Sequence, residues 1–172
     1  MDDKKLTALK TKIIKMRWMF FDVDGVFTDG SLFYGADGEV LKRFNALDGF
    51  GIKELKKNGI GVGLISGRDH AATRIRANEL GISIIMLGKE NKLEAFTNWS
   101  NSNKIDPKTC GHMGDDYPDL ELFSAVGFAA SVPNAIEEVK QNADFVTTKS
   151  GGEGAVREIA HLITEYKGKS VP

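Results

Sequence analysis

Short apolar runs alternate with longer amphipathic segments along most of this chain, and few folds accommodate that alternation. The apolar runs, each of a length suited to a buried strand, are residues 16–21, 61–65, 82–87, 109–113, 128–130 and 145–146. The expected helices are residues 48–58, 69–80, 92–99, 120–124, 136–141 and 156–166, with Asp69 as the N-cap of the second. Strands that alternate with helices form a mostly parallel sheet. We therefore predict an α/β fold with a doubly wound, mostly parallel sheet.

One segment interrupts this alternation. Residues 32–34 and 40–45 flank the turn sequence GADG at 35–38, a pattern typical of a β-hairpin. No internal repeat or linker divides the rest of the chain. We expect one domain at 16–172, with a projecting hairpin, preceded by an N-terminal extension at 1–15 that lies outside the core.

Composition excludes several classes of protein. With 41% hydrophobic and 27% charged residues, the chain is typical of a globular protein. Its 23 Lys and Arg against 24 Asp and Glu leave a net charge of −1, which argues against a nucleic-acid partner. Cys110 is the single cysteine, so no internal disulfide can form. No apolar stretch is typical of a membrane span or signal peptide, and we expect a cytoplasmic protein without a membrane partner.

Polar side chains follow the predicted strands at their carboxyl ends, where ligands bind in open parallel sheets. These residues are Asp22, Asp24, Ser66, Lys92, Asp115, Asp116 and Asp119. Carboxylates gathered at one place repel one another unless a cation lies among them. Mg²⁺ prefers oxygen ligands and keeps room for a substrate phosphate, so the pattern predicts Mg²⁺ as cofactor. The three histidines and Cys110 show no spacing typical of zinc.

Each of these residues also has an ordinary structural interpretation. An aspartate after a strand is more often a turn or capping residue, Ser66 alone is more often a cap, and Lys92 alone is more often solvated. Arg68 and Arg76 can equally be exposed charges on a helix. We interpret His112, on a predicted core strand, as a buried structural histidine. The joint occurrence of the acidic, hydroxyl and lysine positions favours a shared site.

The four motifs and their order resemble the haloacid dehalogenase superfamily of phosphotransferases. The motifs are DVDGVFTDG at 22–30, SGR at 66–68, Lys92, and GDDYPD at 114–119. The resemblance implies that Asp22 attacks phosphorus and forms an aspartyl phosphate, while Asp24 acts as general acid and base. It implies that Ser66 and Lys92 hold the phosphoryl oxygens.

The same resemblance implies the metal site. Asp22 and Asp115 would bind Mg²⁺ through their carboxylates and Asp24 through its backbone carbonyl. Either Asp116 or Asp119 would order the waters of the metal.

A narrower resemblance covers nearly the whole chain. The chain has no room for a cap domain between Asp22 and Ser66 or between Lys92 and Asp115. The segments DGFGI at 48–52 and GGEGAVRE at 151–158 are similar to those of the capless tetrameric 3-deoxy-D-manno-octulosonate 8-phosphate phosphatases. The resemblance implies a phosphoric monoester hydrolase of lipopolysaccharide biosynthesis, active as a homotetramer in which neighbouring subunits close the site. The implied substrate-binding residues are Asn45, Ala46, Leu47, Asp48, Gly49, Lys53, Gly67, Arg68 and Arg76. It also implies that the glycine-rich segment 151–154 approaches a neighbouring subunit's site.

Three alternatives stay open at this point. Lys53 stands where an arginine is common, so a nine-carbon acylneuraminate 9-phosphate remains a candidate substrate. A non-catalytic phospho-acceptor domain also combines an acidic cluster, a hydroxyl and a lysine, although it has no need of an acid and base at Asp24. A pseudoenzyme or partner-binding subunit is the third alternative, and the complete set of catalytic positions disfavours it.

Overall fold

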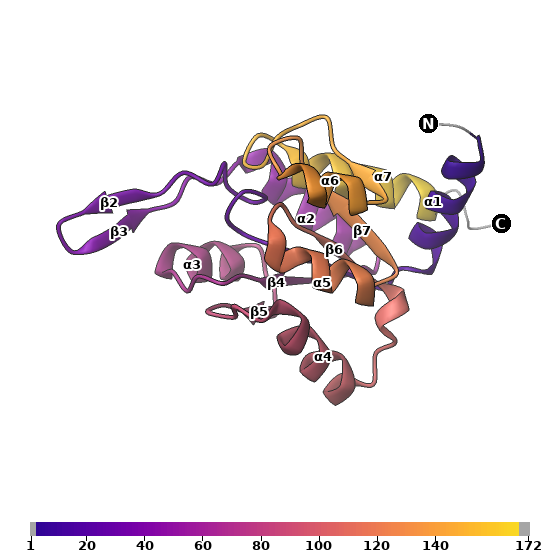
Figure 1. The fold of residues 1–172 in the computed structure, drawn as a ribbon, viewed down its shortest axis with the longest axis horizontal. Helices are drawn as coiled ribbons and strands as arrows, with labels where there is room; N and C mark the ends of the chain where they lie inside the picture. Colours follow the sequence, from indigo (N-terminus) through magenta and orange to yellow (C-terminus); the bar gives the residue numbers. More distant parts are fainter. Residues whose placement is uncertain (1–2, 169–172) are drawn as a thin grey trace.

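A six-stranded parallel sheet forms the centre of the molecule (Figure 1). This structure is a computed structural model, and it describes residues 3–168. The strand order is β5-β4-β1-β6-β7-β8, and every neighbouring pair in it is parallel. The strands are β1 (Trp18–Phe21), β4 (Gly61–Ile65), β5 (Ile84–Met86), β6 (Cys110–Met113), β7 (Phe128–Ser131) and β8 (Phe145–Val146). The predicted doubly wound α/β fold without a cap domain is confirmed.

Seven α-helices accompany the sheet in the described part of the chain. They are α1 (Asp3–Lys15), α2 (Ala46–Lys57), α3 (Ala71–Glu79), α4 (Lys92–Asn103), α5 (Tyr117–Ala125), α6 (Glu137–Asn142) and α7 (Ala155–Gly168). The prediction that Asp69 caps α3 is wrong: the side chain of His70 accepts from the backbone of Ala72, whereas the Asp69 carboxylate pairs with Arg74. Helix α5 begins before the predicted residue 120 because Asp116 and Asp119 form a capping box there.

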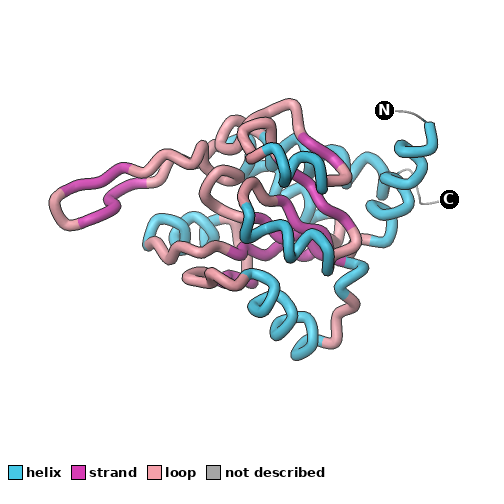
Figure 2. The backbone as a smooth tube through the Cα atoms, viewed as in Figure 1, coloured by secondary structure: helices cyan, strands magenta, loops and turns pink. Residues whose placement is uncertain are grey.

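The predicted hairpin projects from the body of the molecule as strands β2 (Phe33–Gly35) and β3 (Gly38–Leu41). Figure 2 shows these strands at the far end of long loops, away from the central sheet. They form a separate antiparallel sheet, and large apolar side chains on them, such as Phe33 and Tyr34, are exposed. The hairpin therefore offers apolar surface that its own chain leaves uncovered.

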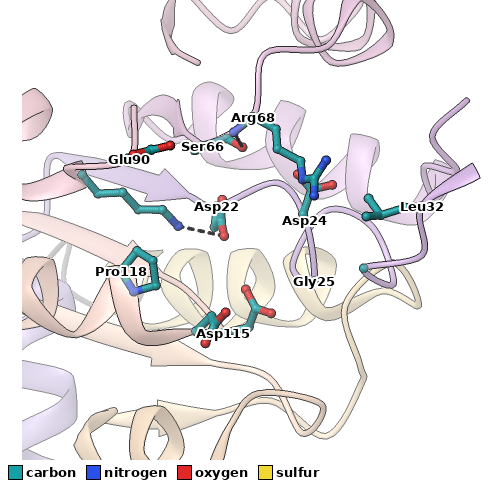
Figure 3. A pocket seen from close by; sticks show the side chains of 13 residues that line it. Asp22, Asp24, Gly25, Leu32, Ser66, Arg68, Glu90, Asp115 and Pro118 are labelled. Atoms are coloured by element: carbon teal, nitrogen blue, oxygen red, sulfur yellow. Dashed lines mark hydrogen bonds and ion pairs between the residues drawn. The ribbon is translucent and has the colours of Figure 1, made fainter. Parts of the chain in front are cut away.

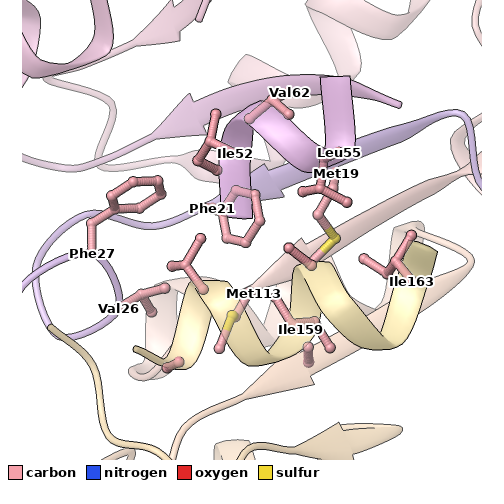
Figure 4. Close-up of a cluster of buried hydrophobic side chains, with 14 of the residues drawn as sticks. Met19, Phe21, Val26, Phe27, Ile52, Leu55, Val62, Met113, Ile159 and Ile163 are labelled. Atoms are coloured by element: carbon pink, nitrogen blue, oxygen red, sulfur yellow. The ribbon is translucent and has the colours of Figure 1, made fainter. Parts of the chain in front are cut away.

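Alternate residues of β1 supply the two hydrophobic clusters on opposite faces of the sheet. Met19 and Phe21 join the larger cluster with residues of α2 and α7, including Ile52 and Ile159 (Figure 4). Phe20, between them in the sequence, joins a smaller cluster with side chains of α4 and α5. The central strand is thus fixed from both sides, and the loop at its carboxyl end has a rigid base.

The N-terminal extension predicted at 1–15 is not separate from the core where the structure describes it. Helix α1 lies at the end of the molecule opposite the hairpin, next to α7 (Figure 1). Its Leu9 and Ile13 are buried in the larger cluster, and Lys12 forms an ion pair of 2.5 Å with Asp144. Residues 1 and 2 lie outside the described range. Over residues 3–168, no helix is both long and apolar enough to cross a membrane.

Candidate active site

An open pocket of about 550 Å³ lies at the carboxyl ends of β1, β4 and β6. The predicted site residues that line it are Asp22, Asp24, Ser66, Gly67, Arg68, Lys92, Asp115 and Asp116. Gly25, Gly30 and Pro118, which belong to the predicted motifs, also line the pocket, as do Leu32 and Glu90, which the sequence did not single out. The parallel topology thus collects side chains from all four motifs, as expected.

The loop after β1 places Asp22 across from Asp115, with a carboxylate oxygen of each within 4.8 Å of the other (Figure 3). Asp22 is nearly buried, and its Oδ1 accepts a hydrogen bond of 2.7 Å from the backbone of Val23. Gly25 turns the loop with a φ of +88°, and a Cβ at this position would lie 2.0 Å from Asp115 Oδ2. Only glycine allows the backbone to pass so close to that carboxylate.

Lys92 connects the carboxylates of the first and fourth motifs. Its Nζ lies 2.8 Å from Asp22 Oδ2 and 2.7 Å from Asp119 Oδ1, and the residue is only 4% exposed. Burial lowers the pKa of Lys92, but the two neighbouring carboxylates outweigh burial and raise it above the ordinary value. The interpretation of Lys92 as a solvated surface lysine is therefore wrong, because the residue is buried and its ammonium group lies beside Asp22.

The acidic cluster has the chemistry of a divalent-cation site. Asp22, Asp115 and Asp119 each offer an oxygen within 4.8 Å of the others. In the metal-free protein, burial raises the pKa of Asp22 to about 7 and that of Asp115 to about 8. Asp115 Oδ1 is buried without a hydrogen-bond partner among the described residues. A hard cation between Asp22 and Asp115 would satisfy that oxygen and favour both ionised carboxylates, so these residues fit Mg²⁺.

Asp119 differs from the other two carboxylates because its oxygens already accept hydrogen bonds. Oδ1 lies 2.7 Å from Lys92 Nζ and 2.7 Å from His112 Nε2, while Oδ2 accepts from the backbone N–H groups of Asp115 and Asp116. Burial alone would raise the pKa of Asp119, but His112 and Lys92 hold it below the ordinary value. Asp119 is fully buried and lies behind the pocket, where it holds the loop that carries Asp115.

Asp24 is held by Lys42, to which the sequence analysis gave no role. The Lys42 ammonium pairs with Asp24 Oδ1 and lies 2.9 Å from Glu39 Oε1, and its side chain is 1% exposed. Glu39 belongs to β3, so this network connects the hairpin to the pocket. Arg68 extends the network, since its Nη1 lies 3.7 Å from Glu39 Oε2. Lys42 is distant from Asp24 in the sequence, and the hairpin alone brings the two together.

Seven predicted substrate-binding residues do not line the pocket of the described chain. They are Asn45, Ala46, Leu47, Asp48, Gly49, Lys53 and Arg76. Asp48 is buried, and its Oδ1 accepts from the backbone of Arg157 in α7. Arg76 donates to the backbone carbonyl of Asn45 over 3.3 Å. Within one chain Asp48 and Arg76 connect α2 and its N-cap to neighbouring helices, and contact of any of the seven with substrate stays a prediction.

The glycine-rich segment packs against the loop of the first motif in its own chain. Gly152 donates a backbone hydrogen bond of 3.1 Å to Val26, and a Cβ on Gly151 would lie 1.8 Å from the carbonyl oxygen of Gly25. The Asn134 side chain joins the two segments, because it donates to Gly25 and accepts from Gly151. The segment therefore supports the loop behind Asp24, whereas its approach to a neighbouring subunit remains a prediction.

Comparisons with known proteins agree with this geometry. The profile of the haloacid dehalogenase-like hydrolase family matches residues 82–159. The chain is 38% identical to the 3-deoxy-D-manno-octulosonate 8-phosphate phosphatase KdsC of Haemophilus influenzae over 94% of this chain and 90% of that protein. A similar solved structure is the crystal structure of the phosphatase from Moraxella catarrhalis in complex with magnesium, phosphate and 3-deoxy-D-manno-octulosonate (KDO). Its chain is 38% identical to this one, with a TM-score of 0.92, and the match covers 95% of this chain and 94% of that one.

A second solved structure supports the same assignment. The cobalt-bound phosphatase from Haemophilus influenzae is 39% identical to this chain, with a TM-score of 0.88, and the match covers 92% of this chain and 93% of that one. Identity at this level over nearly full lengths, together with the four motifs at one pocket, establishes the relationship. The chain belongs to the 3-deoxy-D-manno-octulosonate 8-phosphate phosphatase family of haloacid dehalogenase-like hydrolases.

Proposed function

We propose that this protein is a Mg²⁺-dependent phosphatase that hydrolyses 3-deoxy-D-manno-octulosonate 8-phosphate. The observation that carries the proposal is the convergence of Asp22, Asp115 and buried Lys92 at one pocket. The related Moraxella phosphatase, whose structure contains magnesium, phosphate and KDO, supports the substrate class. Family membership also favours a hydrolase over the phospho-acceptor domain and the pseudoenzyme. The proposed cytoplasmic location rests on the sequence alone.

The reaction proceeds in two displacements at phosphorus. An Asp22 oxygen forms a bond to phosphorus while the bond from phosphorus to the sugar oxygen breaks, and Asp24 gives its proton to that oxygen. Asp24 then accepts a proton from water, whose oxygen attacks phosphorus and releases Asp22 and inorganic phosphate. Lys92 stabilises the charge on the transferring phosphoryl group, and Ser66, at the carboxyl end of β4, binds one of its oxygens.

The acidic residues have different roles at the proposed Mg²⁺ site. Asp22 and Asp115 would hold Mg²⁺ through their carboxylates and Asp24 through its backbone carbonyl, and Asp116 at the pocket edge would order the water around the ion. Asp119 keeps Asp115 and Lys92 in place, because its own oxygens are already occupied. When bound, Mg²⁺ supplies positive charge that offsets the charge on the phosphoryl group.

The open pocket requires closure, and a homotetramer supplies it. A bare site would leave an aspartyl phosphate open to water. The exposed apolar side chains of the hairpin, such as Phe33, Tyr34 and Leu41, suit packing against another copy of the chain. The substrate carboxylate would be bound by cations away from the phosphate. These are Arg68 at the edge of the pocket, and Lys53 and Arg76, which lie outside the pocket of their own chain. Light scattering tests this arrangement, and a monomer fully active at assay concentration would contradict it.

A phosphate-release screen tests the substrate. We expect purified protein with Mg²⁺ to release phosphate from the eight-carbon keto acid phosphate faster than from nine-carbon keto acid phosphates. Faster release from a nine-carbon acylneuraminate 9-phosphate would instead assign the protein to that substrate, as the lysine at position 53 allows. Asp22→Asn is the matched control, since it keeps the size of the side chain and removes the nucleophile. Undiminished turnover by Asp22→Asn would contradict the proposed mechanism.

A further inference from the structure

A buried histidine that the proposed mechanism does not use lies directly behind the carboxylate cluster. His112 lies on β6, and its side chain has no solvent exposure. Its Nε2 is 2.7 Å from Asp119 Oδ1, and the Asp119 side chain is also fully buried. This contact joins the core of the sheet to the network that reaches the pocket.

The chemistry of the two groups decides where the proton of the imidazole lies. A carboxylate only accepts hydrogen bonds, so Nε2 carries the proton and donates it to Asp119. The other ring nitrogen, Nδ1, makes no hydrogen bond of ordinary geometry with the described residues. Burial lowers the pKa of His112 and outweighs the Asp119 carboxylate and a hydrogen bond with the Phe20 backbone, both of which favour the charged ring. The imidazole is therefore neutral and in a single tautomer, as a fixed donor requires.

Two short series of contacts lead from His112 to the reacting groups. In the first, Asp119 Oδ1 also accepts from Lys92 Nζ, which lies 2.8 Å from Asp22 Oδ2. In the second, Asp119 Oδ2 accepts from the backbone N–H of Asp115, over 3.1 Å. The orientation of one carboxylate thus sets the place of the lysine beside Asp22 and of the loop that carries Asp115.

We propose that His112 is a positioning residue, whose Nε2–H fixes the orientation of the Asp119 carboxylate and through it the positions of Lys92 and Asp115. Without this donor, Lys92 is the remaining side-chain donor to Asp119 Oδ1 in the described structure, and Oδ1 is held less firmly than Oδ2, which still accepts from the backbone N–H groups of Asp115 and Asp116. The place of Lys92 beside Asp22 is then fixed less tightly. Loss of position at reacting groups lowers the rate of reaction more than the binding of substrate. The kinetic part of this inference rests on the proposed phosphatase function.

Two substitutions at position 112 separate hydrogen bonding from packing. His112→Phe keeps a ring of similar shape and removes the donor, whereas His112→Gln can present an amide N–H near the place of Nε2. Phe123→Leu is the matched control, because the Phe123 ring packs edge-on against the His112 ring, 5.9 Å between centroids, without a hydrogen bond to Asp119. It disturbs the same buried region and leaves the donor in place.

The kinetic experiment compares these variants in phosphate release with saturating Mg²⁺. A hydrogen bond to a buried charge corresponds to a factor of about ten or more. We expect His112→Phe to lower kcat about tenfold or more with KM within about twofold, His112→Gln to recover most of kcat, and Phe123→Leu to stay near wild type. Equal kcat in wild type and folded His112→Phe would overturn the proposal, as would equal losses in His112→Phe and Phe123→Leu.

A second experiment needs no activity and no metal. In ¹⁵N-labelled wild-type protein treated with a chelator, we expect the His112 imidazole to show a protonated Nε2 and a bare Nδ1. The backbone amide signals of Asp115 and Asp116 should shift in His112→Phe and stay near their places in Phe123→Leu. A wild-type imidazole protonated at Nδ1 instead would overturn the proposal, even if His112→Phe does not fold. If the tautomer is as expected and wild type hydrolyses no keto acid phosphate, the proposed function fails and the positioning of Asp119 stands.

Discussion

The acidic cluster predicts an unusual dependence of stability on pH in the metal-free protein. The pKa values of Asp22 and Asp115 are raised to about 7 and about 8, from 3.8 for an ordinary aspartate. Between pH 4 and 8 these two carboxyl groups therefore bind more protons in the folded protein than in the unfolded chain, and the stability they contribute falls as pH rises. Most proteins that contain only exposed carboxylates lack such a loss at neutral pH.

The size of the effect follows from these two pKa values. Integration of the proton difference from pH 6.5 to 8.5 gives a loss of about 2 kcal/mol for Asp115 and about 1 kcal/mol for Asp22. The lower limit of pH 6.5 keeps small the contribution of buried His112 to the change in unfolding free energy, since a histidine in the unfolded chain is already half deprotonated at that pH. Wild type should therefore lose about 3 kcal/mol of unfolding free energy across this range.

Urea unfolding with a chelator, followed by circular dichroism at the two pH values, measures this loss. Asp115→Asn removes the more strongly shifted carboxylate, and we expect its loss to shrink to about 1 kcal/mol. Added Mg²⁺ should stabilise wild type more at pH 8.5 than at 6.5, because the ion no longer competes with protons. Metal-free wild type that keeps or gains stability from pH 6.5 to 8.5 would refute the reasoning.

Three further predictions concern packing and local geometry. Gly25→Ala should lower kcat about a hundredfold in a folded protein, because its Cβ would displace the Asp115 carboxylate; phosphate release near the wild-type rate would contradict this. Ile13→Ala should lower the unfolding free energy by about 2–4 kcal/mol in urea titrations, because Ile13 is buried. Ile14→Ala is the control, and since Ile14 is exposed we expect a change of less than about 0.5 kcal/mol. Equal effects would mean that α1 is not part of the core. Asp48→Ala should cost about 1–2 kcal/mol by the same measurement, since Asp48 accepts hydrogen bonds from the start of α7, and a neutral result would exclude that role.

Most of the fold and the four motif positions could be predicted from the sequence. The reason is that each depends on a short stretch of chain, since an apolar run predicts a strand and the polar residue after it marks the carboxyl end. Parallel strands place these ends at one edge, so Asp22, Ser66 and Asp115 line the same pocket. The wrong N-cap prediction at Asp69 also concerns neighbouring residues, because Asp69 and His70 can each cap α3. The ion pair between Asp69 and Arg74 occupies the Asp69 carboxylate, and His70 is the cap.

The sequence by itself determined which residue types stand at the ends of the strands, because periodicity and motif spacing act within one element. Only the tertiary structure decided that Lys42 pairs with Asp24, that His112 donates to Asp119, and that Leu9 is part of the core. These contacts join elements far apart in the chain, and their geometry depends on how helices and strands pack together. Side-chain partners of that kind follow from the assembled fold, because no local pattern encodes a distance between separate elements.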